Sequence, residues 1–394
     1  MNIRSLLTTR IIVWFLFFLL FVSAIAISVF YFYQDSVEKK KLSQITVGYP
    51  FLENVAVATV TDADWLDKFQ HELNKARLST TTSVPPISYR EKSYWLRIKY
   101  KSGEEKELFA NRDSVIYDPE RGWLSNRKLT EYMKILTSRL DQEHYGKPMS
   151  WQQVDQLWPR KTTATAIDLE TGHTFDILRF GGYYHADVEP LTANDTEMIQ
   201  HIYEDWSWKR RAVVVTVGDV QLAGSMNAMP HGQGQITDNQ FEGHFCIHFA
   251  QSKVHKSTRV DPGHQLMIYK ASNKLHEKVI EANPVDFVNF FITAVANGDL
   301  LSTQLMTQGK VDQHQQLWDR LKEELRFVAI ESIEEVPGSK KDETQVQVNL
   351  TVTYNHPINE THHYSLLLNL IKLDPKLGWV GSLNDLAQLA LTQN

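Results

Sequence analysis

Residues 229–249 read MPHGQGQITDNQFEGHFCIHF and include Cys246, the only cysteine among the 394 residues of the chain. If the end of this stretch is an extended strand, His244, Cys246 and His248 lie on one face, because successive side chains of a strand point to opposite sides. His231 precedes the cysteine by 15 residues, at the start of a glycine-rich segment. The stretch therefore predicts a β fold in which a thiol and several imidazoles come together.

A reactive cysteine needs a base or a cation that stabilises its thiolate, donors for the oxyanion, and access to substrate. A histidine within hydrogen-bond reach supplies the base, and glycine-rich turns supply backbone N–H donors. With one cysteine the chain cannot form an internal disulfide, so in an exported protein the thiol is either buried and inert or chemically useful. We expect Cys246 to be ionised by a neighbouring imidazole at a surface cleft.

The order of these residues resembles the signature of the L,D-transpeptidases. That family carries His-Gly, then a gap, then Ser/Thr-His-Gly-Cys followed by an apolar residue, Arg or Asn, and another apolar residue. Here His231-Gly232 is followed, after a similar gap, by residues 243–249, which read GHFCIHF. Three positions depart from the family pattern: Gly243 replaces Ser/Thr, Phe245 replaces the glycine before the cysteine, and His248 replaces Arg.

The resemblance covers roughly residues 160–270 and implies that residues 146–280 form an all-β, L,D-transpeptidase-like domain. It implies that Cys246 attacks a peptide carbonyl in peptidoglycan stem peptides. His231 would be the base, and His244 would shape the pocket or the oxyanion site. The implied reaction is acyl transfer or hydrolysis through a thioester, with no cofactor and no metal.

A second group of side chains lies upstream, in the segment 181–190, which reads GGYYHADVEP. A His-x-Asp pair can orient a base, because the carboxylate selects the imidazole tautomer, and it can also bind a metal. A basic aromatic run, residues 206–211, could hold sugar rings or stem-peptide carboxylates. The residues expected to contact substrate or to orient the others are therefore His185, Asp187, Gly232, His248 and Arg210.

A metal-dependent reading uses many of the same residues. Nitrogen, sulfur and oxygen donors suited to zinc are present in His231, His244, Cys246, His248, His185 and Asp187. A catalytic zinc needs three protein ligands and an open position. A zinc-dependent peptidase or amidase is therefore one alternative function. A non-enzymatic envelope protein that binds or scaffolds is the other, because Cys246, flanked by Phe245, Ile247 and Phe249, could be a small buried side chain.

The N-terminal segment differs from the rest of the chain. Ile11 to Tyr33 is a run of 23 residues without charge, which as a helix spans about 34 Å and reaches across a bilayer core. Arg4 and Arg10 precede it and favour a cytoplasmic N-terminus. A cleaved signal peptide is the rival reading, but the apolar run continues well past the weak cleavage motif at residues 24–26. We expect a single-pass membrane protein whose bulk is extracytoplasmic.

The C-terminal part predicts an α+β domain. Val285 to Val295 has the spacing of an amphipathic helix, and a second helix is expected over residues 313–327. Three strands are expected at residues 345–354, 361–372 and 378–383. Helices followed by a curved antiparallel sheet resemble an NTF2-like domain, and such domains in exported proteins often act as spacers or platforms for envelope protein partners.

Together these observations predict a multidomain protein with an N-terminal transmembrane helix. The expected segments are a cytoplasmic tail at 1–10, a transmembrane anchor at 11–33, a small α+β domain at 46–145, the L,D-transpeptidase-like β domain at 146–280, and the NTF2-like domain at 283–394. The formal net charge of −6 argues against a nucleic-acid partner. The expected partners are peptidoglycan, the membrane through the N-terminal helix, and envelope proteins through the C-terminal domain.

Overall fold

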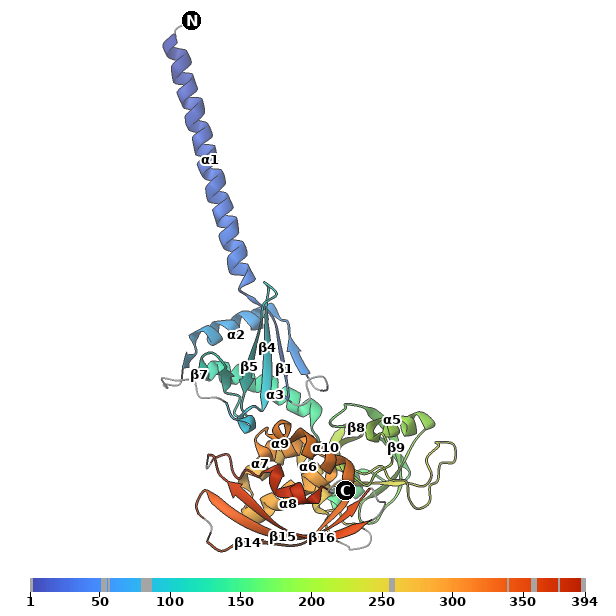
Figure 1. Ribbon diagram of the computed structural model, residues 1–394. Coiled ribbons are helices and arrows are strands. Elements are labelled where there is room, and N and C mark those ends of the chain that lie inside the picture. Colours follow the sequence, from blue (N-terminus) through green and yellow to red (C-terminus); the bar gives the residue numbers. More distant parts are fainter. Residues whose placement is uncertain are drawn as a thin grey trace. The chain divides into compact units, whose positions relative to one another are not determined.

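The computed structural model describes residues 3–50, 55, 57–78, 87–254, 259–338, 340–355, 360–374 and 376–390. The protein is mixed α/β, with several sheets and one apolar N-terminal helix (Figure 1). It divides into two compact units, each continuous in space but not in sequence. The first comprises Met1–Gly48, Ala58–Pro86 and Tyr94–Leu136, and the second comprises Tyr49–Val57, Ile87–Ser93 and Thr137–Asn394.

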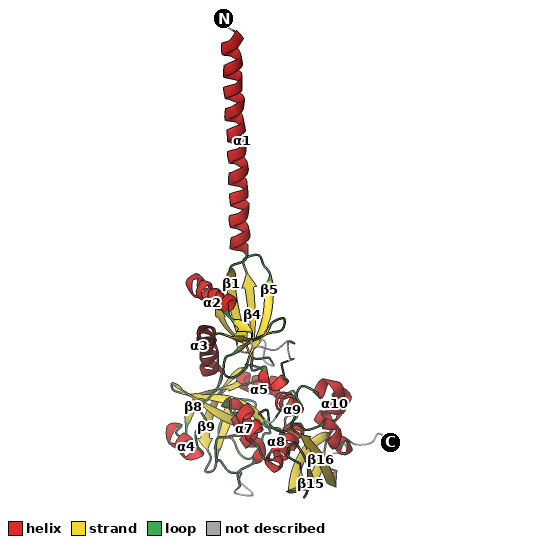
Figure 2. Cartoon of the chain, turned by 90° about the vertical axis from the view of Figure 1, so that its left-hand side faces the viewer, coloured by secondary structure: helices red, strands yellow, loops and turns green. Residues whose placement is uncertain are grey.

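Helix α1, Ile3–Lys39, begins the chain and is drawn as one continuous helix in Figure 2. Within it, Phe18–Lys39 is long and apolar enough to cross a membrane, and none of that window is buried. A signal sequence satisfies the same criterion of length and composition. The predicted anchor at residues 11–33 lies inside α1. The predicted tail at 1–10 falls partly on residues 1–2, outside the described residues.

The first unit contains a seven-stranded sheet in the order β2-β1-β4-β5-β6-β7-β3. Its strands are β1 Leu42–Gly48, β2 Val57–Val60, β3 Arg77–Leu78, β4 Tyr94–Tyr100, β5 Glu105–Ala110, β6 Ile116–Asp118 and β7 Gly122–Ser125. Helix α2, Ala63–Lys75, begins where the Asp62 side chain accepts a hydrogen bond from the Trp65 N–H, and it buries Leu66, Phe69 and Leu73. Helix α3 covers Arg127–His144.

The second unit is built around a closed barrel of six antiparallel strands in the order β10-β13-β12-β11-β8-β9. They are β8 Thr162–Asp168, β9 Thr174–Gly181, β10 Ala186–Pro190, β11 Arg211–Val217, β12 Val220–Met226 and β13 Phe245–His248. Alternate side chains fill the barrel, among them Val213, Val215, Phe245 and Ile247, which are all fully buried. An interior of this size leaves room for side chains only. Any site must therefore lie outside the barrel core.

The all-β prediction for residues 146–280 is wrong in one respect, because four helices lie in that range. They are α4 Trp151–Leu157, α5 Ala193–Tyr203, α6 Pro262–Ala271 and α7 Leu275–Glu281. Local signals start three of them. Ser150 and Gln153 form a capping box before α4. Thr192 and Asp195 form a reciprocal capping box before α5, and Asp261 caps α6, which begins with a proline.

The C-terminal part has helices α8 Pro284–Asn297, α9 Leu300–Thr307 and α10 Gln315–Glu324, and a sheet in the order β14-β15-β16. Its strands are β14 Leu325–Glu335, β15 Glu343–Tyr354 and β16 Thr361–Ile371. The strand predicted at 378–383 is absent, and only an isolated bridge from Ile371 to Val380 is present there. The additional strand, β14, begins at Leu325, where the predicted helix was expected to continue to residue 327.

The barrel and the C-terminal part share a hydrophobic core. Helix α6 packs on β11 and β12 and also on α8. One cluster of buried side chains joins Ala212 and Val214 of the barrel with Phe287 and Phe291 of α8. The division into separate domains between residues 280 and 283 remains a prediction, since the packing is continuous across it.

Arg90 connects the segment Ile87–Ser93 to the rest of the second unit through hydrogen bonds. Its side chain is 1% exposed. Its guanidinium donates to the carbonyl oxygens of Leu305 at 2.8 Å and Trp379 at 2.6 Å, and also to that of Leu377. Burial lowers the pKa of Arg90 to about 10, so the group is still charged at neutral pH. The planar fork of arginine suits this set of carbonyls better than a lysine ammonium does.

Replacing Arg90 by methionine should lower the free energy of unfolding by roughly 3 kcal/mol, because the buried carbonyls lose their donors. Arg90→Lys should recover only part of this, since one ammonium cannot reach all three carbonyls. Thermal unfolding of the detergent-solubilised chain measures the effect. Arg97→Met is the control, because the exposed Arg97 pairs with Glu107 only at 3.7 Å, and such pairs contribute little. Equal losses in the two variants would contradict this account.

Candidate functional site

Cys246 occupies β13, which pairs with β10 on one side and with β12 on the other. Its neighbours Phe245 and Ile247 point into the barrel core, so strand alternation turns the thiol to the outer face. The register places Asp187 of β10 directly opposite Cys246. Phe245 has ordinary strand backbone, so its side chain causes no strain beside the thiol. Cys246 is 5% exposed.

His231 lies against the thiol. Its Nε2 is 3.4 Å from Cys246 Sγ, and its Nδ1 is 2.8 Å from the carbonyl oxygen of Met229. Because a carbonyl oxygen only accepts, Nδ1 carries the proton of the neutral ring. The lone pair of Nε2 therefore faces the sulfur, which is the arrangement that a base for this thiol requires.

The loop between His231 and His244 is closed by their backbones. The His231 N–H donates to the His244 carbonyl at 2.9 Å, and the His244 N–H donates back at 2.8 Å. Gly243 has φ +93°, and a Cβ there would lie 2.4 Å from the His231 carbonyl oxygen. A Cβ on Gly232 would lie 2.5 Å from His244 Cε1. Both positions therefore require glycine.

A buried carboxylate also holds this loop. Glu189 of β10 is fully buried and accepts hydrogen bonds from the N–H groups of Gln235 at 2.7 Å and Ile236 at 2.9 Å. Sequence reasoning did not identify Glu189. The available signal was a glutamate between the apolar residues Val188 and Pro190 of a strand, because a buried carboxylate requires partners.

His244 and Trp208 flank His231. The His244 ring centroid is 4.4 Å from that of His231 and 5.3 Å from that of Phe180. His244 Nδ1 is 3.0 Å from the Gln233 carbonyl oxygen, so Nε2 is the nitrogen left for other contacts. Trp208 packs on His231 at 5.1 Å and is 42% exposed. Sequence reasoning placed Trp208 in a substrate-holding patch, and the structure places it against the His231 ring.

Asp187 and His185 lie on the other side of the thiol. Asp187 Oδ1 is 3.9 Å from Cys246 Sγ and 3.3 Å from His185 Nε2. His185 Nδ1 donates to the Lys253 carbonyl oxygen at 2.8 Å. Asp187 therefore lies close to both the Cys246 thiol and the His185 imidazole.

His248 lies on the same strand as Cys246, with a ring nitrogen within 4.8 Å of the sulfur, and it belongs to a buried stack of three imidazoles. Its ring is 4.2 Å from His185 and 3.7 Å from His264, with interplanar angles of 25° and 15°. Its Nδ1 contacts Ser252 Oγ at 3.0 Å, and His264 Nδ1 contacts Ser225 Oγ at 2.9 Å. Burial is the main cause that lowers the pKa of both His248 and His264. These rings are neutral at pH 7 and serve as packing.

Arg210 does not join the thiol group. Its Nη2 contacts Asp261 Oδ2 at 2.8 Å, its backbone N–H donates to Asn297 Oδ1, and its guanidinium lies 6.0 Å from the Phe327 ring. These contacts place it between the start of α6 and the C-terminal sheet. The proposed role in holding substrate beside Cys246 has no geometric support in these contacts.

The resting thiol is protonated. Burial raises the pKa of Cys246, and the Asp187 carboxylate raises it further by charge and by hydrogen bonding. This differs from the sequence-based expectation of an ionised thiol at a cleft. The physical reason is that the strand register brings a negative charge, rather than a cation, directly opposite the sulfur.

Two groups of side chains in the described part of the chain could hold a metal ion. One is His231, His244 and Cys246, and the other is His185, Cys246 and His248. In each group the donor atoms lie within 4.8 Å of one another. The first group is half-buried at its two histidines, and the second is buried throughout.

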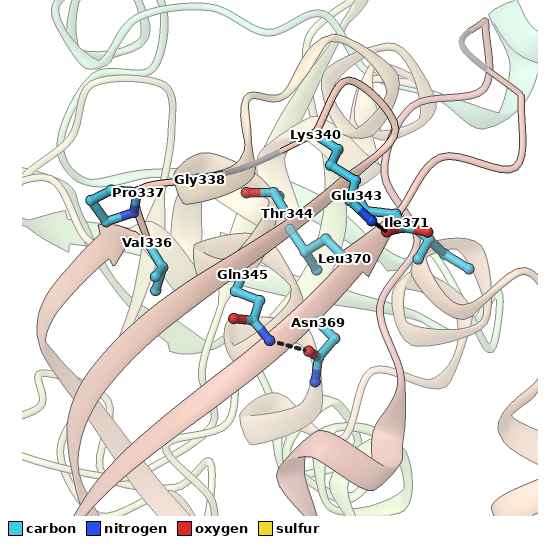
Figure 3. Close-up of a pocket in the computed structure, with 10 residues that line it drawn as sticks. All are labelled: Val336, Pro337, Gly338, Lys340, Glu343, Thr344, Gln345, Asn369, Leu370 and Ile371. Carbon is cyan, nitrogen blue, oxygen red and sulfur yellow. Dashed lines mark hydrogen bonds and ion pairs between the residues drawn. The ribbon is translucent and has the colours of Figure 1, made fainter.

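A separate cavity of about 390 Å³ lies at the end of the C-terminal sheet (Figure 3). Its polar lining groups pair with each other. Gln345 Nε2 donates to Asn369 Oδ1 at 2.9 Å, and Lys340 Nζ contacts Glu343 Oε2 at 3.2 Å. It brings no nucleophile together with a base, so the Cys246 group is the better candidate for chemistry.

Comparison with known proteins adds no assignment. No family model matches the chain, and no curated protein shows a significant match.

The buried histidines should make the protein sensitive to acid. The folded-state pKa of His264 is lowered, and that of His144 is lowered to about 4, both by burial, whereas an unfolded histidine has a pKa of about 6.5. As pH falls below 6.5, the unfolded chain binds protons that the folded chain does not. The free energy of unfolding then falls, by up to about 1.4 kcal/mol per pH unit for each such histidine.

Urea unfolding midpoints between pH 7.5 and 4.5 measure this loss. His144→Phe keeps the packing between Tyr49 and Tyr145, at 5.1 and 4.8 Å, and should reduce the slope below pH 6.5. His201→Gln, at an exposed position of α5, is the control and should leave the curve unchanged. A wild-type midpoint that stays flat down to pH 4.5 would rule out this explanation.

Proposed function

We propose that the protein is a membrane-anchored, extracytoplasmic enzyme that performs acyl transfer or hydrolysis on peptidoglycan stem peptides through Cys246. One observation carries the proposal. His231 Nε2 lies 3.4 Å from the sulfur, with its other nitrogen committed to the Met229 carbonyl oxygen. The resemblance of His231-Gly232 and residues 243–249 to the L,D-transpeptidase signature supports the substrate class.

In the first half-reaction Sγ attacks the carbonyl carbon of a stem-peptide amide while its proton moves to His231 Nε2. The C–N bond then breaks, and the imidazolium returns that proton to the departing amine. A thioester on Cys246 and a free amine result. Because the resting thiol is protonated, proton transfer accompanies the attack instead of preceding it.

In the second half-reaction an amine or a water attacks the thioester carbonyl. His231 Nε2 takes one proton from the attacking group and delivers it to the departing sulfur. An amine acceptor gives a new peptide cross-link, and water gives a carboxylate. The same residues serve both outcomes, so the acceptor that reaches the thioester selects between them.

The neighbouring side chains suit supporting roles in this scheme. Neutral His244 donates through Nδ1 to the Gln233 carbonyl oxygen, which leaves a lone pair at Nε2. It can therefore accept a hydrogen bond from a substrate N–H, but it would need a second proton to stabilise an oxyanion. Of the two roles that the resemblance implies for His244, shaping the pocket fits this tautomer better.

The flanking parts of the chain suit a protein of the cell envelope. Helix α1 would be the anchor, with the N-terminus cytoplasmic and the remainder outside. The C-terminal helices and sheet, if NTF2-like as their order suggests, would act as a platform for envelope proteins. Both assignments agree with a substrate that lies outside the membrane.

Purified wall fragments digested with wild type and with Cys246→Ala provide the test of activity. Mass spectrometry should show new cross-linked or trimmed stem peptides only with wild type, with a loss of about 10³-fold or more in the variant. His231→Gln should lose about 10²–10⁴-fold, as expected for removal of a general base. Absence of new products with wild type would leave a non-enzymatic binding protein as the better description, and identical new products from wild type and Cys246→Ala would exclude Cys246 as the nucleophile.

The anchor has its own test. Full-length protein should fractionate with membranes and have the intact mass of the uncleaved chain, whereas a chain that lacks residues 1–33 should remain in the aqueous phase. The physical reason is the apolar, uncovered surface of α1. A mature protein that begins downstream of residue 26 would show that α1 is a cleaved signal sequence.

A further inference from the structure

We infer that His231, His244 and Cys246 form a binding site for a thiophilic divalent cation, of which Zn²⁺ fits the donor set best. Two imidazole nitrogens and one thiolate are borderline-soft ligands that zinc prefers. The three donor atoms already lie within 4.8 Å of one another. This inference concerns equilibrium binding and does not require that the protein be an enzyme.

The spacing between His231 and Cys246 matches that of two ligands on one zinc ion. Zinc binds sulfur at about 2.3 Å and imidazole nitrogen at about 2.0–2.1 Å, so tetrahedral geometry separates the two donors by about 3.5 Å. The separation between His231 Nε2 and Cys246 Sγ is 3.4 Å. A small rotation of the His244 ring would bring the third donor to the same ion.

Both imidazoles are held by backbone carbonyls in the tautomer that a metal needs. His231 Nδ1 donates to the Met229 oxygen at 2.8 Å, and His244 Nδ1 donates to the Gln233 oxygen at 3.0 Å. Histidines that bind metals almost always donate their second ring N–H in this way, which orients the ring and raises its basicity.

The scaffold around these ligands is rigid. The paired backbones of His231 and His244 hold the two rings side by side, and Glu189 anchors the loop between them through the N–H groups of Gln235 and Ile236. Cys246 comes from the central strand of three, between β10 and β12. A site built on such supports loses little conformational entropy when an ion binds.

The alternative group of His185, Cys246 and His248 is a poorer site. The His185 and His248 rings are nearly parallel, at 25°, with centroids 4.2 Å apart. Ring lone pairs lie in the ring planes, so two stacked rings do not direct their nitrogens to one point. All three residues are also buried, whereas His231 and His244 are partly open to solvent and leave a fourth position for water.

Charge also favours an ion bound to Cys246. Binding displaces the thiol proton, and a coordinated thiol is deprotonated outright. The Asp187 carboxylate, 3.9 Å from the sulfur, then faces a net positive centre instead of a thiolate. If the proposed acyl transfer also holds, zinc and peptide compete for the same sulfur, and zinc is a reversible inhibitor.

Cobalt and zinc titrations of the chelator-stripped, full-length protein in detergent provide the test. We expect one Co²⁺ per chain, visible-region bands of tetrahedral cobalt, a thiolate-to-cobalt charge-transfer band in the near ultraviolet, and displacement by Zn²⁺. Cys246→Ser should lose the charge-transfer band. His244→Gln should weaken binding by at least about 100-fold, since loss of a direct ligand costs no less than loss of its outer-shell partner.

His248→Asn is the matched control, because it removes a donor of the rejected group, and it should retain cobalt binding. Circular dichroism establishes that each variant folds.

Alkylation supplies a readout that needs no variant, because the chain has a single thiol. Saturating Zn²⁺ should slow modification of Cys246 at least about 10-fold. Absence of cobalt binding by wild type, or loss of binding in His248→Asn but not in His244→Gln, would overturn the inference. None of these readouts depends on peptidoglycan activity.

Discussion

The pairing of β13 between β10 and β12 determines both the barrel and the site. This strand has only four residues, Phe245–His248, yet it closes the sheet and supplies the sulfur. Phe245 and Ile247 fill the barrel, so Cys246 and His248 point outward. A shift of register by one residue would exchange the two sets, turning the thiol into the barrel core and two large apolar side chains out of it. The hydrophobic effect on Phe245 and Ile247 therefore places Cys246.

The electrostatic setting of Cys246 explains why its partners matter. In isolation, burial and the facing Asp187 keep the proton on sulfur. The thiolate forms only when that proton is removed, either by an imidazole during attack on a carbonyl or by a metal ion that displaces it. His231 Nε2 is placed for both. A neutral resting thiol also resists oxidation, because the thiolate is the form that oxidants attack.

Helix α6 connects this site to the rest of the second unit. Its His264 ends the imidazole stack that runs through His248 to His185, and the Asp261 that caps it pairs with Arg210. The opposite side of α6 packs on α8. The barrel is therefore braced by the C-terminal part through buried contacts, and the neutral rings of His248 and His264 behave as flat groups with hydroxyl partners, Ser252 and Ser225.

The sequence by itself determined the features that depend on local pattern. An uncharged run of 23 residues implies a long apolar helix, alternation around Cys246 implies a strand with His244 and His248 on its outer side, and the motif order indicated that His231 meets the thiol. Tertiary structure alone decided which outward side chains contact the sulfur. Strand register brought Asp187 opposite the sulfur, and Arg210 pairs with Asp261 instead. His248 stacks on His185 and His264, and Glu189 holds the loop that carries Gln235 and Ile236. Periodicity specifies the face on which a side chain lies, because it follows from backbone geometry. The neighbour it meets there depends on long-range packing, which no local pattern encodes.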